Sequence, residues 1–268
     1  MYGEPMTIIT LGPEGTFSHE LALKMGCPSI SLVSTIHGIF SAVARGEGEG
    51  IVPIENSEAG GVGETLDGLL RFPVFITAEM YMPIHHYLAS LVPLSRMRVI
   101  YAHPQTHEQC SGHLEKWGLP VIHTSSNASS ALEAKKTPNA GAILSASAAS
   151  YYKMPVLVSN IENNASNTTR FVRISPKHSP ESGAQKCSIV IDPTLDRAGL
   201  LHDLLEVFSR RAINLTRIES RPSKRGMGNY VFFLDYAWTT DTCEALDELK
   251  SISTVKELGC YRNIGVPP

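Results

Sequence analysis

Short apolar runs alternate with helical patterns through the first 158 residues, and this alternation constrains the fold more than any other feature. Runs typical of strands are Thr7–Leu11, Ile51–Ile54, Phe72–Ala78, His85–Leu91, Arg98–Ala102, Val121–His123, Ala140–Leu144 and Val156–Val158. Helical patterns separate many of them, at Glu20–Met25, Glu64–Leu70, His107–Trp117, Ser129–Lys135 and Ser145–Tyr151. The alternation predicts an α/β fold with a mostly parallel sheet. The length allows two such lobes, and small ligands usually bind in a cleft between lobes.

A change in composition at Pro176–Gln185 divides the chain. This stretch is rich in Pro, Ser and Gly and has no hydrophobic period, which is typical of a linker. The elements predicted after it are, in order, a strand at Lys186–Ile191, a helix with an apolar stripe from Leu200 to Phe208, strands at Ile213–Ser220 and Tyr230–Tyr236, a helix at Cys243–Leu249 and a strand at Thr254–Tyr261. This βαββαβ order is ferredoxin-like. We therefore expect two domains, over residues 6–181 and 186–265.

Charged side chains are scarce before the linker. Residues 1–185 hold 12 Lys/Arg and 15 Asp/Glu, whereas residues 186–268 hold 11 of each in 83 positions. A net charge of −3 without a Lys/Arg cluster argues against nucleic acid as a partner. Membrane insertion is not expected, because no apolar run approaches the roughly 20 residues that span a bilayer. The N-terminus also lacks the pattern of a signal peptide.

The cysteines and histidines give no pattern typical of a metal site. Five cysteines lie far apart without a Cys-x-x-Cys pair, which suits reduced thiols in a cytoplasmic protein. His103 and His107 are four positions apart, but Pro104 lies between them. The adjacent His85 and His86 would point to opposite faces of a strand. We therefore expect no metal site.

Three short motifs stand where strands end or loops begin. Gly12–Ser18 reads Gly-Pro-Glu-Gly-Thr-Phe-Ser, Val52–Ser57 reads Val-Pro-Ile-Glu-Asn-Ser, and Asn167–Phe171 reads Asn-Thr-Thr-Arg-Phe. Each motif alone is weakly specific. In this order and spacing they are similar to the catalytic domain of the prephenate dehydratase family. Ile213–Thr216 and Glu219–Pro222 resemble the regulatory ACT domain that is attached to that enzyme.

The resemblance covers about residues 7–262 and implies a monofunctional enzyme. Its catalytic domain would have two α/β lobes, like a periplasmic binding protein, and its ACT domain would be ferredoxin-like. The enzyme would be a carbon–oxygen lyase of phenylalanine biosynthesis. It would convert prephenate to phenylpyruvate, releasing the ring carboxylate as CO₂ and the ring hydroxyl as water. The reaction involves no redox change, so the resemblance implies neither a cofactor nor a metal.

The resemblance places the reacting centre at Thr169, which matches the Thr that serves the family as proton donor or hydrogen-bond partner to the leaving hydroxyl. A Thr hydroxyl is a very weak acid, so it needs a neighbour that returns or relays the proton. Arg170 either pairs with a substrate carboxylate or makes a structural ion pair between lobes. Asn56 and Ser57 are expected to donate hydrogen bonds to a carboxylate. Burial would raise the pKa of Glu55 and keep it protonated.

The residues expected to bind substrate lie on both sides of the cleft and are Thr16, Phe17, Ser18, Gln105, Ser126 and Phe171. Thr16 and Ser18 would hold a carboxylate together with backbone N–H groups, which attract anions at a helix start. Ser18 is also a candidate N-cap of the first helix. Phe171 would pack either on the substrate ring or in the core.

Family members bind phenylalanine between two ACT domains. The matching positions in this chain are Gly199, Leu200, Leu201, Asn214, Leu215, Thr216, Glu219, Ser220 and Arg221. Because Leu200 is larger than the residue usual in this loop, we expect it to crowd a phenylalanine ring. A site between two ACT domains requires an even number of subunits, so a homodimer or homotetramer is expected. The alternative is that this domain only dimerises.

Two other functions remain open. An arogenate dehydratase would act on the aminated form of prephenate and release phenylalanine directly. A non-catalytic amino-acid-sensing protein would clasp a small carboxylate between its lobes, but it would have no need for the Thr169–Phe171 motif.

Overall fold

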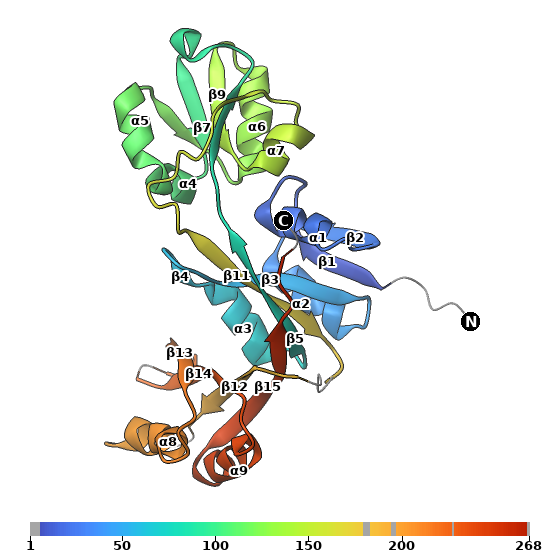
Figure 1. Cartoon of the computed structure of the whole chain (residues 1–268), viewed down its shortest axis with the longest axis vertical. Coiled ribbons are helices and arrows are strands. Elements are labelled where there is room, and N and C mark those ends of the chain that lie inside the picture. Colours follow the sequence, from blue (N-terminus) through green and yellow to red (C-terminus); the bar gives the residue numbers. More distant parts are fainter. Residues whose placement is uncertain (1–5, 179–182, 194–196, 227, 267–268) are drawn as a thin grey trace, which may run out of the picture.

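The computed structural model describes residues 6–178, 183–193, 197–226 and 228–266. Three parts are stacked along the long axis of the molecule (Figure 1). The first lobe lies in the middle, the second lobe lies at one end, and the C-terminal domain lies at the other. The linker Pro176–Gln185 falls partly outside the described residues.

The first lobe is a sheet covered by helices. Its strands, in spatial order, are β5 (Phe75–Pro83), β11 (Thr168–Ser175), β3 (Glu49–Asn56), β1 (Thr7–Leu11) and β2 (Ser29–Val33), and the short β4 (Gly60–Gly61) pairs with β3. The helices are α1 (Phe17–Lys24), α2 (Ile36–Ala44) and α3 (Gly63–Arg71). Apolar residues recur at helical spacing in α2 and α3, and they bury Phe40, Val43, Leu66 and Leu69 in the core of this lobe.

The second lobe has a sheet of its own. Its strands, in spatial order, are β10 (Val156–Val158), β6 (Tyr87–Ser90), β9 (Ala140–Leu144), β7 (Val99–Ala102) and β8 (Val121–His123). A short 3₁₀ helix, η1 (Leu94–Arg96), precedes β7. The four helices are α4 (Pro104–Gln109), α5 (Ser111–Trp117), α6 (Asn127–Lys136) and α7 (Ala146–Tyr151).

Both sheets are mixed, so the expectation of a mostly parallel sheet is wrong. In the first lobe β1 is parallel to β2 and β3, but β11 is antiparallel to β3 and β5. In the second lobe β7 is parallel to β8 and β9, but β6 is antiparallel to β9 and β10. The reason is topological: β11 returns from the second lobe and enters the first sheet in the reverse direction.

Two segments join the lobes, residues 84–86 and residues 159–167. The Gly12–Ser18 loop makes a further contact, because Ser145 Oγ donates to the Gly15 carbonyl at 3.0 Å. Gly15 has a φ of +87°, and a Cβ there would lie 2.9 Å from the Cα of Ala148 on α7. Glycine is therefore required for this close approach of the two lobes.

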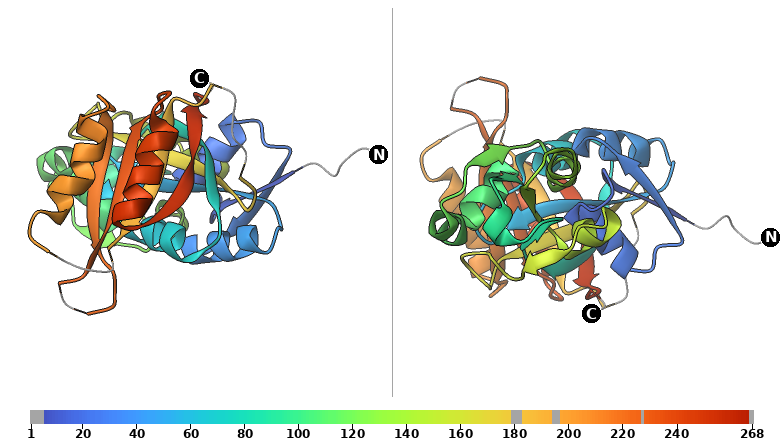
Figure 2. Two further views of the ribbon diagram at one scale, coloured as in Figure 1. Left: turned by 90° about the horizontal axis from the view of Figure 1, so that it is seen from below. Right: turned by 90° about the horizontal axis from the view of Figure 1, so that it is seen from above.

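The C-terminal domain has the expected ferredoxin-like order. Its elements are β12 (Lys186–Asp192), α8 (Leu200–Ser209), β13 (Leu215–Pro222), β14 (Tyr230–Ala237), α9 (Thr242–Ile252) and β15 (Thr254–Asn263), with the strands in the order β13-β14-β12-β15. Helices α8 and α9 lie side by side on the outer face (Figure 2). The two-lobed α/β domain and the βαββαβ domain are thus confirmed.

The other face of this sheet packs on the first lobe. Val190, Val231 and Phe233 join the same core as α3, and the end of β15 pairs with the middle of β5 through Arg262 and Asn263. Lys256 also reaches α3, where its ammonium donates to the carbonyls of Leu69, Leu70 and Phe72. The strands of the two domains therefore form one continuous sheet.

The cysteines differ from expectation. Cys187 and Cys260 face each other across β12 and β15 and form a disulfide, so the expectation that all five thiols are reduced is wrong for this pair. The two cysteines are 73 residues apart, and their pairing depends on the strand register, which the sequence pattern does not contain. Cys27, Cys110 and Cys243 are free. No helix in the described part of the chain is long and apolar enough to cross a membrane. The cytoplasmic location stays a prediction.

Candidate active site

A cavity of about 520 Å³ lies between the two lobes. Eight of the expected catalytic and substrate-binding residues line it, and they are Thr16, Phe17, Ser18, Asn56, Gln105, Ser126, Thr169 and Phe171. Three others, Glu55, Ser57 and Arg170, do not form part of its wall. The fold thus brings the loop after β1, the end of β3, the start of β11 and two helix starts of the second lobe to one place.

Helix starts form much of the cavity wall. Cap or first-turn residues of α1, α2, α3, α4 and α6 line it. The hydroxyl of Thr16 accepts the His19 N–H and caps α1, so the expectation that Ser18 is the N-cap is wrong. Ser126 caps α6 by accepting the Ser129 N–H at 3.0 Å. Because helix N-termini carry partial positive charge, this wall attracts anions.

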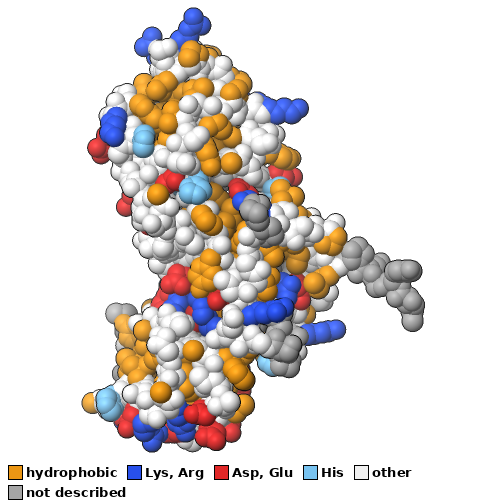
Figure 3. Space-filling model, in the orientation of Figure 1, with side chains coloured by type: hydrophobic (Ala, Val, Ile, Leu, Met, Phe, Trp, Pro, Cys, Tyr) orange, Lys and Arg blue, Asp and Glu red, His pale blue; other side chains and the backbone are white. Residues whose placement is uncertain are grey.

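Charged side chains are few on this wall. Among its described residues none is Lys or Arg, and the only carboxylate belongs to Glu64 on α3. Figure 3 shows charged side chains gathered instead near the boundary between the first lobe and the C-terminal domain. An anion in the cavity would therefore be held by N–H, hydroxyl and amide groups.

Thr169 and Asn56 are paired across β11 and β3. The Asn56 Oδ1 accepts the N–H groups of Glu58 at 3.1 Å and Ala59 at 3.0 Å, which fixes the orientation of the amide. Its Nδ2 donates to Thr169 Oγ1 at 3.0 Å and to Asn167 Oδ1 at 2.8 Å. Thr169 is therefore an acceptor toward Asn56, and its own proton remains available to a ligand in the cavity.

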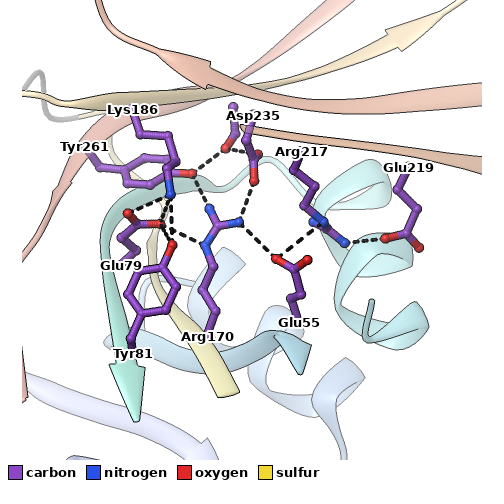
Figure 4. Close-up of polar contacts among 10 residues, drawn as sticks. Glu55, Glu79, Tyr81, Arg170, Lys186, Arg217, Glu219, Asp235 and Tyr261 are labelled. Atoms are coloured by element: carbon purple, nitrogen blue, oxygen red, sulfur yellow. Dashed lines mark hydrogen bonds and ion pairs between the residues drawn. The ribbon is translucent and has the colours of Figure 1, made fainter. Parts of the chain in front are cut away.

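Arg170 is not among the residues that line the cavity, and its side chain points toward the sheet of the C-terminal domain (Figure 4). Its side chain is 4% exposed, and it donates to Glu79 at 2.8 Å, to Asp235 at 2.5 Å and to the Tyr261 hydroxyl at 2.9 Å. Burial opposes protonation, but the nearby Tyr261, Asp235 and Glu79 raise the pKa of Arg170 overall. The role of binding a substrate carboxylate is wrong for this geometry, because the neighbouring strand residue Thr169 occupies the cavity face.

Arg170 makes structural ion pairs, which is one of the two roles expected for it. These ion pairs, however, join other parts of the molecule than the two lobes. Glu79 belongs to the first lobe, whereas Asp235 and Tyr261 belong to the C-terminal domain. The guanidinium thus links the first lobe to the C-terminal domain rather than one lobe to the other.

Glu55 and Ser57 also differ from expectation. The Glu55 side chain is 38% exposed and lies 3.5 Å from Arg170, so it is neither buried nor inside the cavity. Ser57 accepts the Thr168 N–H with its hydroxyl at 3.0 Å and holds the loop after β3 against the start of β11. Strand alternation turns Glu55 away from the face that Asn56 occupies, and Ser57 lies in the turn that follows β3.

Two buried polar residues of the site were missed. His86 lines the cavity, its Nε2 lies 3.0 Å from Gln109 Oε1, and its Nδ1 has no hydrogen-bond partner. Burial lowers the pKa of His86, which favours a neutral ring. Asn167 is fully buried behind Asn56, and its Nδ2 is unpartnered. Their place in the sequence could have indicated them, because both residues lie in the segments that cross between the lobes.

The expected effector residues lie in different surroundings. Glu219 and Arg221 face the first lobe, where Arg221 lies 3.5 Å from Asp67. Leu200 is 7% exposed and belongs to the core of its own domain; that it crowds a phenylalanine ring stays a prediction. The accessible positions are Gly199, Leu201, Asn214, Thr216 and Ser220. Gly199, in the left-handed region at φ +81°, caps α8, and Leu215 packs partly against the domain core.

Comparison with known proteins places the chain in a family. The family model described as prephenate dehydratase matches residues 8–179, and the ACT domain model matches residues 194–252. The chain belongs to the prephenate dehydratase family. It is 34% identical to the prephenate dehydratase of Methanocaldococcus jannaschii, over 90% of each chain. It is 37% identical to the bifunctional chorismate mutase/prephenate dehydratase of Pseudomonas aeruginosa, over 96% of this chain and 73% of that protein.

Solved structures of the family share the whole architecture. Prephenate dehydratase from Arthrobacter aurescens, in complex with L-Phe, superposes with a TM-score of 0.88 at 30% identity, over 96% of this chain and 90% of that one. The enzyme from Staphylococcus aureus gives a TM-score of 0.84 at 27% identity, over 96% of this chain and all of that one. The family members therefore share both the two lobes and the ACT domain with this chain.

Proposed function

We propose that the chain is a prephenate dehydratase that converts prephenate to phenylpyruvate, CO₂ and water. The observation that supports this most directly is the Thr169 hydroxyl, which is held by Asn56 with its proton free in a cavity between two lobes. The catalytic domain is assigned to residues 6–181 and the ACT domain to residues 186–265.

The bond changes balance without a redox partner. The bond between the ring and its carboxylate breaks, its electron pair enters the ring, and CO₂ leaves. The carbon–oxygen bond opposite breaks at the same time, and the departing hydroxide takes one proton and leaves as water. The ring becomes aromatic, which supplies the driving force.

Thr169 acts at the departing hydroxyl. A hydroxyl is too weak an acid to transfer its proton fully to a neutral group, so its contribution is a hydrogen bond that strengthens as negative charge develops on the leaving oxygen. Full transfer completes only as hydroxide leaves, and the proton is restored to Thr169 from solvent. Asn56 keeps the hydroxyl pointing into the cavity throughout.

Prephenate is a dianion, and helix starts of both lobes suit it. The N-terminal turns of α1 and α6 offer N–H groups beside Thr16, Ser18 and Ser126, with Gln105 on the same wall. A wall with few charges binds the carboxylates without holding them so tightly that CO₂ cannot leave. Phe17 offers aromatic surface to the ring. Phe171 reaches the cavity wall but is 1% exposed and packs in the core of the first lobe, as the second of the two alternatives expected.

Phenylalanine is the proposed effector, and a homodimer or homotetramer through ACT domains is the proposed assembly. The ACT strand β13 is at the edge of its sheet, and its Ile218 side chain is 48% exposed. An exposed edge strand is a ready surface for a second copy of the same domain. The accessible effector positions Thr216 and Ser220 lie on this strand, and the L-Phe complex of the Arthrobacter relative supports the choice of ligand.

Arogenate dehydratase is the second candidate, because the Glu64 carboxylate on the cavity wall would suit the ammonium of arogenate. The test is to incubate the purified protein with prephenate and arogenate, separately and in competition, while measuring phenylpyruvate and phenylalanine. We expect phenylpyruvate from prephenate at the higher kcat/KM. Preference for arogenate would reverse the substrate assignment, and turnover of neither would favour a non-catalytic binding protein.

A further inference from the structure

Two adjacent residue pairs on β3 and β11 face opposite sides of the first lobe's sheet. Thr169 pairs with Asn56, and Arg170 pairs with Glu55. Because successive strand residues alternate between faces, the first pair lines the cavity and the second pair faces the ACT domain. Figure 4 shows the second pair beneath the ACT sheet. Arg170 is the next residue after Thr169, and Glu55 directly precedes Asn56. A shift of either residue of the second pair is therefore a shift next to the residues that carry and hold the reacting hydroxyl.

The ACT domain reaches this second pair through Arg217. Glu55 lies between two guanidinium groups, 3.5 Å from Nη1 of Arg170 and 3.7 Å from Nε of Arg217. The Arg217 side chain is only 7% exposed and is also paired with Glu219 on the same strand. Arg170 by contrast is held closely by Glu79 and Asp235. Glu55 is therefore the loosely held member of the network, and Arg217 is the ACT side chain that fixes it.

The same ACT strand also contacts the loop that orients Asn56. Gly61 pairs with Glu55, and a Cβ at Gly61 would lie 2.2 Å from a carboxylate oxygen of Glu219 and 2.8 Å from Nη2 of Arg217. The loop between Asn56 and Gly61 supplies the two N–H groups that hold Asn56 Oδ1. Strand β13 thus touches both segments that set the position of the Asn56 amide.

We propose that Arg217 is a positioning residue for the chemical step, acting through Glu55 and the loop 58–61 on the Asn56–Thr169 hydrogen bond. The expected effect on kcat rests on the proposed function, whereas the expected effect on the position of the Asn56 amide does not. Loss of Arg217 frees Glu55 to move toward Arg170 and removes the support of Gly61. The helix starts that hold the substrate carboxylates are not in this network, so the expected loss is in kcat rather than in KM.

The kinetic test compares Arg217→Gln and Arg217→Lys with the wild type, using the full chain. Arg217→Gln is expected to lower kcat by about 3- to 30-fold, the range typical of networks that couple sites, with KM changed by less than about twofold. Arg217→Lys keeps a positive charge beside Glu55 and should recover part of the loss. The matched control is Arg225→Gln, because Arg225 pairs with Asp192 within the ACT domain and touches neither Glu55 nor the loop.

A double-mutant cycle tests the route. Glu55→Gln should lower kcat by a similar factor, and the double variant with Arg217→Gln should be no slower than the slower single variant, because both substitutions break the same link. Multiplicative losses would show that Arg217 acts elsewhere. Thermal unfolding of each variant separates a loss of folded protein from a loss of kcat.

Amide hydrogen exchange tests the structural claim without any turnover. Arg217→Gln should speed exchange at residues 56–59 and 168–171 while leaving the second lobe unchanged, and Arg225→Gln should leave all these amides at wild-type rates. If the wild type turns over neither prephenate nor arogenate, the proposed function fails, yet this comparison still decides the positioning claim. Wild-type exchange at those amides in Arg217→Gln, or a kcat within about twofold of wild type, would overturn the proposal.

Discussion

The side-chain amide of Asn56 donates a hydrogen bond of 3.0 Å to Oγ1 of Thr169 across two antiparallel strands. The direction of this bond is set elsewhere, because the amide oxygen of Asn56 is occupied by two backbone N–H groups of the following loop. The Thr169 hydroxyl, which is a weak acid, therefore has a defined orientation toward the cavity. This arrangement supports the proposed donor role of Thr169 and the proposed positioning role of Asn56.

Asn56→Asp should lower kcat by about 100-fold, at the lower end of what positioned proton donors contribute. The carboxylate still accepts the loop N–H groups but has no N–H to donate, so the Thr169 proton turns away from the cavity toward Asp. Steady-state kinetics on prephenate measure the effect, and urea unfolding shows whether the fold is kept. A kcat within about threefold of the wild type would contradict the assigned direction of the bond.

The free energy of unfolding should decrease below about pH 6.5 in a manner that depends on His86. Burial lowers the pKa of His86 in the folded protein, so the unfolded chain takes up a proton at higher pH than the folded chain does. The stabilisation is therefore complete above the unfolded pKa and is lost as pH falls toward the folded one. Its slope is at most about 1.4 kcal/mol per pH unit.

Urea unfolding between pH 7.5 and pH 5 checks this for the wild type, His86→Gln and His202→Gln. The His86→Gln profile should be shallower than that of the wild type. His202 has an exposed side chain in the ACT domain, so its variant should follow the wild type. Parallel profiles for all three proteins would show that His86 is not the group responsible.

Reduction of the Cys187–Cys260 disulfide should destabilise the ACT domain by about 2–4 kcal/mol, because the bridge closes a long loop in the unfolded chain. Thermal unfolding with and without reductant measures the loss. The double variant Cys187→Ala/Cys260→Ala keeps Cys27, Cys110 and Cys243 and should not respond to reductant. An equal response in the double variant would mean that the bridge does not stabilise the domain.

Local patterns predicted many elements well. The strands at Thr7–Leu11, Val121–His123, Ala140–Leu144 and Val156–Val158 have their predicted bounds, because turn residues delimit each run. The helix predicted over residues 107–117 is divided at Cys110 into α4 and α5 instead. Boundaries of this kind depend on packing between elements that the local pattern does not contain.

Long-range relationships were harder to predict. The motifs identified which residues meet in the cavity, but the face on which Arg170 lies depends on Asp235 and Tyr261, 65 and 91 positions away. The disulfide likewise depends on the register of β12 against β15. Composition correctly signalled few charges in the first two-thirds of the chain, and the structure locates this scarcity on the cavity wall.

Replacement of Thr169 by Ala, with kcat measured on prephenate, tests the central claim most directly. Thr169→Ser retains a hydroxyl within reach of Asn56 and serves as the matched control. We expect a kcat about 10²- to 10⁴-fold lower for Thr169→Ala and most of the activity retained for Thr169→Ser. Unchanged turnover of prephenate by Thr169→Ala would contradict the assignment of Thr169 as the hydrogen-bond donor to the leaving hydroxyl.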